Sequence, residues 1–313
     1  MSRAAGVRVE YAALPGRVRA WVEAELRSQV TSAVTQAGGF SPGAAARLVT
    51  ASGGRAFVKA VGPELNPKTP ELFRMERVAM ESLPASPHAP KLLAAYDDGD
   101  WVALLLEDIE GRLPGHPWTS EDADLVFGAL AELTAGLHPS PWPAAPRAEV
   151  TMAGFLTRWP LVRRSPPFDL DPWAGRHLDA LVGLGERALR AIRGDTLTHW
   201  DVRSDNVLVT PENRVVFVDW AHACLSAQWV DPVIAACDVL DDADVDADAL
   251  LSRFPAVRSA DPVDVTALVA AVTGGLAWSA GQPGPPGLPT IRRWQREQAA
   301  ILLAWVRRRT GWA

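Results

Sequence analysis

The segment from His199 to Asn206 constrains this chain more than any other, because it places a carboxylate and an amide five residues apart in a short polar stretch. Asp201 can orient a hydroxyl group and accept its proton. The amide oxygen of Asn206 suits Mg²⁺, which prefers hard oxygen ligands. The spacing His-x-Asp-x-x-x-x-Asn is typical of a phosphoryl-transfer loop. The rest of the chain must then supply a second metal ligand, a phosphate-binding lysine, a glycine-rich turn and a nucleotide-binding connector.

The second metal ligand follows directly. Two short runs rich in β-branched residues, 207–210 and 215–218, surround the polar turn 211–214, which predicts a hairpin. A hairpin returns the chain beside its start, so Asp219 can face Asn206 and share a metal with it. Alone, Asp219 would be read as a carboxylate that caps a turn. Beside the loop motif, the metal role is favoured.

Composition limits the class of protein. With 48% hydrophobic and 22% charged residues, the chain is typical of a soluble globular enzyme. Its net charge of −6 argues against a nucleic-acid partner. Residues 1–10 lack the apolar core of a signal peptide. No uncharged apolar run approaches the roughly 20 residues of a membrane span. We therefore expect a soluble, cytoplasmic protein with no membrane partner.

Hydrophobic periodicity changes along the chain. The first third, after a helical pattern at 15–29, shows strand patterns at 30–35, 44–50, 56–61, 91–96 and 101–106, with a helix after residue 70. Helical patterns then occupy 120–137, 173–193, 232–240, 262–278 and 289–309. This order predicts an α+β fold in two lobes. We expect a nucleotide-binding N-lobe at 1–108, and a C-lobe at 109–313 that carries the catalytic loop, the metal site and an acceptor pocket.

A glycine-rich turn joins two of the predicted strands. Gly38, Gly39 and Gly43 are candidates for phosphate binding, because backbone N–H groups without a neighbouring Cβ can approach phosphate oxygens. We also include Ser41, from the same turn, in the nucleotide site. An ordinary hairpin turn is the alternative. The turn is not a Walker loop, since no Gly-Lys-Ser/Thr follows it.

Lys59 is one of only three lysines among 31 basic residues, and it lies inside an apolar strand. A charge there is costly unless it has a partner, and a compact ammonium suits phosphates. An edge-strand lysine is the alternative. In the following helix we favour Glu76 over Glu81 as its carboxylate partner.

Residues 104–109 pass from an apolar strand into a connector. Extended backbone there can hydrogen-bond the edge of an adenine. We expect Leu106, Glu107 and Ile109 to line the nucleotide site, with Leu106 and Ile109 near the ring.

Taken in order, these residues resemble the aminoglycoside phosphotransferase family. These small-molecule relatives of protein kinases also include choline, homoserine and fructosamine kinases. The resemblance extends from about Thr35 to Asp238 and is most specific in the catalytic half. It implies a bilobal protein-kinase-like fold, ATP or GTP together with Mg²⁺, and phosphorylation of a hydroxyl group on a small molecule.

The resemblance also implies roles. Asp201 would be the catalytic base, Asn206 and Asp219 would hold the metals, Lys59 would bind the α- and β-phosphates, and Glu76 would orient Lys59. His199 would fix the loop through hydrogen bonds. Asp231 resembles a family residue that anchors the following helix, and it stays outside the catalytic set.

Two positions depart from the expected pattern. Trp200 stands where the small-molecule family usually has glycine, so its bulk would reshape the entrance beside Asp201. Arg203 stands where protein kinases usually have lysine. We include it among the catalytic candidates, with contact to the γ-phosphate or pairing with a surface carboxylate both left open.

Other functions and the acceptor stay open. A nucleotide-binding pseudokinase is the main alternative, and a protein kinase is disfavoured by Trp200 and by Trp220-Ala221 after the metal residue. The acidic segment from Asp238 to Asp248 can attract a polycation or be a solvated loop. Three tryptophans can line an acceptor site or pack in the core, namely Trp229, Trp278 and Trp294.

Overall fold

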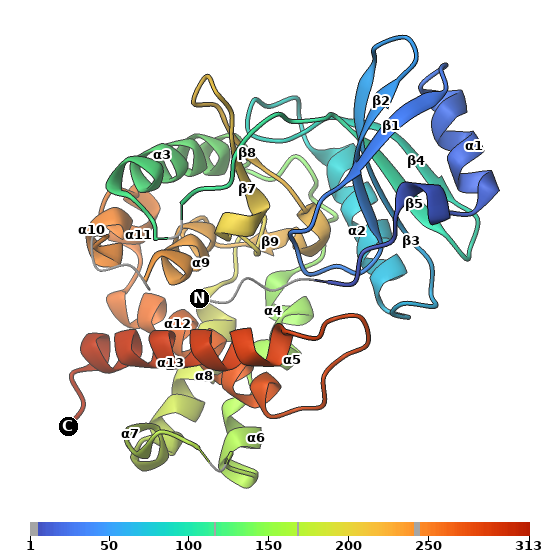
Figure 1. The fold of residues 1–313 in the computed structure, drawn as a ribbon. Helices are drawn as coiled ribbons and strands as arrows, with labels where there is room; N and C mark the ends of the chain where they lie inside the picture. The colour runs from blue at the N-terminus through green and yellow to red at the C-terminus, as the bar shows by residue number, and fades with distance from the viewer. Residues whose placement is uncertain (1–5, 116, 168, 241–244) are drawn as a thin grey trace.

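The structure, a computed structural model, describes residues 6–115, 117–167, 169–240 and 245–313. A five-stranded antiparallel sheet forms in the first third, and helices dominate the rest (Figure 1). The strands are β1 (Val30–Thr35), β2 (Ala44–Thr50), β3 (Arg55–Val61), β4 (Leu92–Asp97) and β5 (Val102–Leu106), in the spatial order β1-β2-β3-β5-β4. The predicted α+β class is confirmed. The domain boundary at residue 108 stays a prediction.

Strand alternation assigns the two faces of the sheet. In β3, Ala56, Val58 and Ala60 pack in the cluster that contains Val18 and Val22 of helix α1 (Gly16–Glu25). The intervening side chains point to the other face, which is covered by α2 (Thr69–Ser82). Figure 1 shows α1 and α2 on opposite sides of the sheet. Lys59, one of the intervening residues, therefore faces α2.

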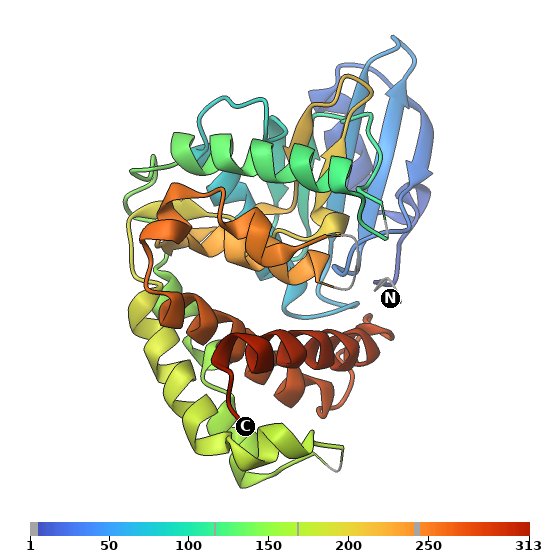
Figure 2. The same cartoon turned by 90° about the vertical axis from the view of Figure 1, so that its left-hand side faces the viewer.

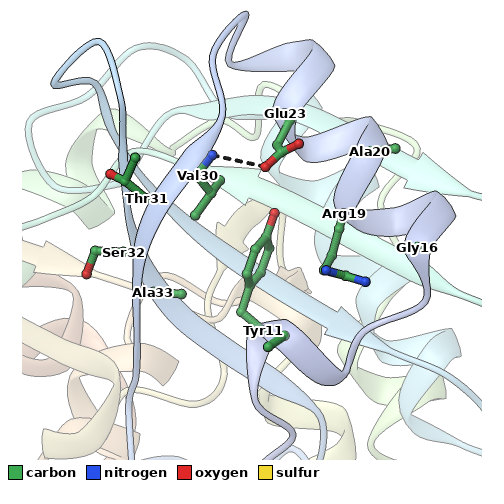
Figure 3. Close-up of a pocket in the computed structure, with 10 residues that line it drawn as sticks. Tyr11, Gly16, Arg19, Ala20, Glu23, Val30, Thr31, Ser32 and Ala33 are labelled. Atoms are coloured by element: carbon green, nitrogen blue, oxygen red, sulfur yellow. Dashed lines mark hydrogen bonds between the residues drawn. The ribbon is translucent and has the colours of Figure 1, made fainter.

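A hollow of about 390 Å³ lies between α1 and the edge strand β1 (Figure 3). Tyr11, from the short 3₁₀ helix η1 (Tyr11–Ala13), and Glu23 line it. Glu23 accepts a hydrogen bond from the N–H of Val30 at 3.0 Å and so ties the helix to the strand. None of its lining residues belongs to the predicted site.

The rest of the chain is mainly helical. Its helices are α3 (Ser120–Gly136), α4 (Ala148–Thr151), α5 (Ala153–Leu156), α6 (Trp159–Arg164), α7 (Pro172–Arg176), α8 (Leu178–Ala191), α9 (Val230–Val239), α10 (Ala247–Leu251), α11 (Pro255–Ser259), α12 (Pro262–Ala280) and α13 (Ile291–Thr310). Figure 2 shows α3, α9 and α13 following one another from the top downward, with α6 and α7 below α13. The short helices escaped prediction because one turn carries too little periodicity.

Helix α12 forms the centre of the helical part. With a mean hydropathy of 1.4, it is the one helix in the described ranges that is long and apolar enough to cross a membrane. Of its most apolar 18-residue stretch, 67% is buried inside the protein. A buried core helix of a folded domain has the same composition, so this observation is weak evidence for a membrane span.

One predicted helix was wrong. The pattern at 173–193 forms α7 and α8, separated at His177, where the backbone leaves the helical region. Trp312 near the chain end stacks on Trp173 with ring centroids 5.9 Å apart, and the His177 ring bonds the carbonyl of Ala313 at 2.9 Å. These long-range contacts fix the break, and helical periodicity does not report them.

Two small antiparallel pairs frame the predicted site. They are β6 (Thr196–Thr198) with β9 (Cys224–Ser226), and β7 (Val207–Val209) with β8 (Val215–Phe217). The second pair is the predicted hairpin, which is confirmed. Because β6 ends just before His199 and β8 ends just before Asp219, the pairs hold residues 199–206 beside residues 218–223.

Candidate active site

His199 is fully buried and fixes the predicted catalytic loop. Its Nε2 lies 3.0 Å from the carbonyl oxygen of Val218, and its Nδ1 lies 3.2 Å from the backbone nitrogen of Asp201. One ring nitrogen thus donates and the other accepts, which is the pattern of a neutral imidazole. Burial lowers the pKa of His199, consistent with the neutral form. With both nitrogens engaged, its position fits the predicted structural role.

Helix α9 anchors the same loop with two carboxylates. Asp231 accepts the N–H groups of His199 at 2.7 Å and Trp200 at 2.9 Å. Asp238 accepts the N–H of Ser204 at 2.8 Å. Seven residues apart, the two aspartates lie on one face of the helix. That i, i+7 spacing is a signal for Asp238 that sequence reasoning missed, since Asp238 was grouped with the acidic segment.

Trp200 adopts a backbone conformation that is unusual for a bulky residue. Its φ is +65°, in the left-handed region that favours glycine. The indole is buried, and its Nε1 has no hydrogen-bond partner within the described ranges. The Asp231 bond to its N–H holds this strained backbone in place.

The carboxylate of Asp201 is held on both oxygens. Arg203 Nη1 donates to Oδ1 at 2.6 Å, and Asn206 Nδ2 donates to Oδ2 at 2.8 Å. Arg203 also donates to both oxygens of Asp205, at 3.0 and 3.1 Å. Each carboxylate oxygen has a second lone pair, so the pairing orients Asp201 without removing its capacity to accept a proton.

Arg203 joins three distant segments. Its guanidinium carbon lies 4.6 Å from the ring centroid of Phe40, in the glycine-rich turn, and 5.3 Å from that of Trp294, in α13. The two rings meet edge to face at 5.0 Å. Burial lowers the pKa of Arg203, but the charges of Asp201 and Asp205 outweigh it and raise the pKa. Of the two alternatives left open for Arg203, pairing with a surface carboxylate is not observed, since its ion pairs are with Asp201 and Asp205 of the loop, and contact with the γ-phosphate stays a prediction.

Lys59, Glu76 and Asp219 form a buried charged triad. Lys59 Nζ contacts Glu76 Oε2 and lies 3.0 Å from Asp219 Oδ1. Burial lowers the pKa of Lys59, but the two carboxylates outweigh burial and raise it. Glu81, the rejected alternative, instead pairs with Arg77 at the surface. Asp219 also has a positive φ, +68°, which directs the chain into η3 (Trp220–His222).

A cavity of about 270 Å³, the sheet-side cavity, opens between the sheet and the loop. Most of the predicted site residues line it, namely Gly38, Gly39, Ser41, Lys59, Glu76, Leu106, Glu107, Ile109, Asn206 and Asp219. Gly43 does not. A Cβ at Gly43 would lie 2.6 Å from the carbonyl oxygen of Ala60, so glycine is required there by close backbone packing.

Arg8 also lines the sheet-side cavity, and sequence reasoning missed it. Its guanidinium donates to the carbonyl oxygens of Gln36 at 3.0 Å and Gly39 at 3.2 Å, and also contacts those of Gly38 and Ser41. It thus braces the glycine-rich turn from the N-terminal segment. No local pattern marks this role, because the turn lies about thirty residues away along the chain.

A second cavity of about 550 Å³, the helix-side cavity, extends from Asp201 into the helical part. Ser41 and Asp219 line both cavities, so the two meet there. Asp201, Arg203, Trp200 and Trp294 line the helix-side cavity. Asp201 therefore lies on one side of the meeting point, while Lys59 and Asn206 lie on the other.

Comparison with known proteins decides the family. The family model described as "Phosphotransferase enzyme family" matches residues 37–262, well over half of the chain. The chain belongs to this family. The predicted small-molecule phosphotransferase activity is thereby confirmed at the level of the family. No curated protein sequence matches the chain.

Solved structures show the same fold as this phosphotransferase. The choline kinase LicA from Streptococcus pneumoniae is 12% identical with a TM-score of 0.61, covering 92% of this chain and 98% of LicA. A thermostable mutant of the aminoglycoside phosphotransferase APH(4)-Ia, in complex with ADP and hygromycin B, is 12% identical with a TM-score of 0.60 and the same coverage. Spectinomycin phosphotransferase APH(9)-Ia, bound to AMP, is 12% identical with a TM-score of 0.57, covering 97% of this chain and 95% of that one. These similarities confirm the predicted kinase-like fold.

Asn206 and Asp219 of the phosphotransferase fit Mg²⁺. Asn206 uses its amide nitrogen on Asp201, which leaves the amide oxygen, and Lys59 contacts Oδ1 of Asp219. Both remaining oxygens are hard donors. Within the described ranges no cluster of three or more His, Cys, Asp or Glu could hold a metal. None is required, since Mg²⁺ usually combines one or two protein ligands with waters and phosphates.

Only some of the candidate acceptor residues of the phosphotransferase lie at the helix-side cavity. Of the three tryptophans, only Trp294 lines the helix-side cavity, whereas Trp229 belongs to the buried core and the half-buried Trp278 packs against it. The described aspartates of the acidic segment have separate contacts. Asp246 caps α10, and Asp248 pairs with Arg309. Residues 241–244 of this segment lie outside the described residues.

Replacing Arg8 of the phosphotransferase with methionine is expected to weaken nucleotide binding about tenfold, the loss of roughly 1.4 kcal/mol of charge-assisted hydrogen bonding. The turn would lose the donor that holds its carbonyl groups. Calorimetric titration with a non-hydrolysable ATP analogue measures the change. Arg17→Met, at an exposed position of α1 that lines neither cavity, is the matched control. Equal affinity in both variants would remove Arg8 from the site.

Asp231 of the phosphotransferase should make stability depend on pH. Burial raises the pKa of Asp231 to about 6, against the opposing hydrogen bonds from His199 and Trp200. In the unfolded chain the pKa is about 3.9. The folded state therefore binds more protons between these values, and stability falls as pH rises through this window. From pH 7 to pH 5 the wild type should gain about 1 kcal/mol relative to Asp231→Asn.

Urea unfolding of both proteins at the two pH values measures this gain. A stability difference between wild type and Asp231→Asn that is the same at pH 5 and pH 7 would exclude a raised pKa at this position.

Proposed function

We propose that this phosphotransferase transfers the γ-phosphoryl group of ATP, or of GTP, to a hydroxyl group of a small molecule in a Mg²⁺-dependent reaction. One observation carries the proposal. The sheet-side and helix-side cavities meet at Ser41 and Asp219, with Asp201 on the far side of the meeting point from Lys59. A nucleotide in the first cavity and an alcohol in the second would bring donor and acceptor together.

The nucleotide would occupy the sheet-side cavity. Lys59, held by Glu76, would bind the α- and β-phosphates, and the turn braced by Arg8 would cover them. Leu106 and Ile109 would flank the base. The backbone N–H of Glu107 is already donated to the carbonyl of Lys91 at 2.9 Å, so the base would use other connector groups.

The acceptor hydroxyl would approach Asp201. Its carboxylate, oriented by Arg203 and Asn206, would hold the hydroxyl in line with the γ-phosphate and accept its proton. Arg203 stays cationic and lies beside that proton acceptor, where it can also offset charge on the transferred group. Asn206 and Asp219 would hold Mg²⁺, which when bound neutralises charge on the phosphates.

The known structures support nucleotide use, since relatives of this fold are solved with ADP and with AMP. The proposal includes an N-lobe at 1–108 that carries the nucleotide site, a C-lobe at 109–313 that carries the acceptor site, and a cytoplasmic location, where ATP is available.

A nucleoside-diphosphate release assay across chemically distinct alcohols tests the proposal, with ATP and GTP compared and Mg²⁺ added or chelated. Product with at least one alcohol, dependent on Mg²⁺, is expected. Nucleotide binding without phosphorylated product from any alcohol would favour the pseudokinase alternative.

A further inference from the structure

The wall of the helix-side cavity is mostly apolar, and this limits the acceptor. Besides Ser41 and Arg203, its uncharged or basic polar side chains are Asn66, Lys68, Thr69, His222, Gln295 and Gln298. Beyond Asp201 the cavity is lined by side chains of α5, α9, α12, α13 and the loop before α13. They include Phe155, Ile234, Leu276, Leu288 and Ile291, together with Met152 just before α5. A cavity of about 550 Å³ is in the range of sites for drug-sized ligands. Burial of polar or charged ligand groups against such a wall is unfavourable.

The glycine pair of α12 shapes this wall. A Cβ on Gly275 would lie 2.6 Å from the ring of Phe155, and one on Gly274 would lie 2.5 Å from the indole of Trp159. Glycine inside a helix costs about 0.5–1 kcal/mol relative to alanine. Here it allows two aromatic rings to contact the helix backbone, and Phe155 thereby becomes part of the cavity wall.

Each carboxylate in the described part of the helix-side cavity already has an ion-pair or hydrogen-bond partner. Asp201 pairs with Arg203, Asp219 pairs with Lys59, and Asp238 accepts the N–H of Ser204. A ligand with several ammonium groups needs several carboxylates to replace its lost hydration. Within the described part of the lining, no further Asp or Glu supplies them.

Trp200 extends the apolar surface up to the reacting position. It precedes Asp201 directly, lines the helix-side cavity, and keeps a backbone conformation that glycine would adopt without strain. An apolar side chain therefore adjoins Asp201 in the lining of the cavity where the acceptor would lie.

We infer that the acceptor is a neutral alcohol with a large apolar part, bound against α5, α12 and α13 with its hydroxyl at Asp201. The inference rests on the proposed function for the phosphoryl transfer itself. It predicts that neutral alcohols are preferred over polycationic amino sugars as acceptors. Affinity comes from burial of apolar ligand surface, and position comes from Asp201.

Binding and turnover are measured separately. Quenching of tryptophan fluorescence by 2-naphthalenemethanol, with ATP analogue and Mg²⁺ present, reports binding to the wild type, Ile291→Glu and Val263→Glu. Both substitutions place a carboxylate in the first turn of a helix, but Ile291 lines the cavity and Val263 is exposed. We expect at least about tenfold weaker binding to Ile291→Glu and unchanged binding to Val263→Glu. If Ile291→Glu does not fold, the neutral and smaller Ile291→Ser replaces it in the binding measurement.

Turnover is measured with 2-naphthalenemethanol, geraniol and chloramphenicol as neutral alcohols, and with kanamycin and choline as cations. A higher kcat/KM for a neutral alcohol than for either cation supports the inference. Preferred phosphorylation of kanamycin or choline, or equal naphthalene binding in both glutamate variants, overturns it and leaves the proposed function intact. A third outcome separates the two proposals. If Ile291→Glu alone loses binding of 2-naphthalenemethanol but no alcohol gives a phosphorylated product, the proposed function is overturned and the preference for an apolar ligand stands.

Discussion

Asp201→Asn is expected to lower kcat by about 10²–10⁴, the usual effect of losing a general base. Asparagine keeps the size of the side chain but cannot take the proton of the acceptor. Arg203 would stay in place, because both oxygens of Asp205 also hold it. Nucleotide affinity should stay close to that of the wild type, since Asp201 lines the helix-side cavity and is absent from the lining of the sheet-side cavity.

Steady-state release of nucleoside diphosphate gives kcat, and calorimetry gives the nucleotide affinity. Asp246→Asn is a matched control, because Asp246 caps α10 and asparagine caps a helix equally well. Turnover of Asp201→Asn within a few-fold of the wild type would exclude Asp201 as the base. A large loss of nucleotide affinity in this variant would mean that the substitution disturbed the loop rather than the proton transfer.

Asp219→Asn is expected to lower kcat on the order of 10³, in the range reported for removing one charge-stabilising group from a reaction centre. The variant should also lose most of the gain in nucleotide affinity that Mg²⁺ gives the wild type. Asp219 lies where the two cavities meet and pairs with the ammonium of Lys59, so in the proposed reaction it would also serve the metal and the phosphates. Titration of an ATP analogue with Mg²⁺ and with a chelator measures the second effect without any turnover.

Lys59 provides the internal check on this result. Asp219→Asn leaves Lys59 paired with Glu76, so the ammonium keeps one buried carboxylate. Lys59→Met should weaken nucleotide binding with and without Mg²⁺, whereas Asp219→Asn should act mainly in its presence. If the two variants show the same dependence on Mg²⁺, the metal site lies elsewhere.

Local sequence patterns determined a large part of this protein. Alternation of apolar residues located all five strands of the sheet, and the polar turn at 211–214 located the β7–β8 hairpin. These features depend on neighbours within a few residues, and the sequence reports such neighbours directly. The pairing of Lys59 with Glu76 was also predictable, since a charge inside an apolar strand requires a partner and the next helix offered one.

Longer-range features could not be predicted in this way. The break between α7 and α8 depends on the last residues of the chain, and the brace at Arg8 depends on a turn about thirty residues away. Arg203 was left between two partners. Its ion pairs are local, with Asp201 and Asp205 two residues away on either side, but the rings of Phe40 and Trp294 beside its guanidinium come from distant segments. No periodicity connects these positions.

The sequence alone thus determined which residues can do chemistry, because the spacing of Asp201, Asn206 and Asp219 is fixed by one loop and one hairpin. The tertiary structure alone decided what surrounds them. The cavity beside Asp201 is built from α5, α9, α12 and α13, whose side chains meet only after the helices pack. Reaction type follows from local backbone geometry, whereas the shape and polarity of the acceptor site follow from helix packing across the whole C-terminal part.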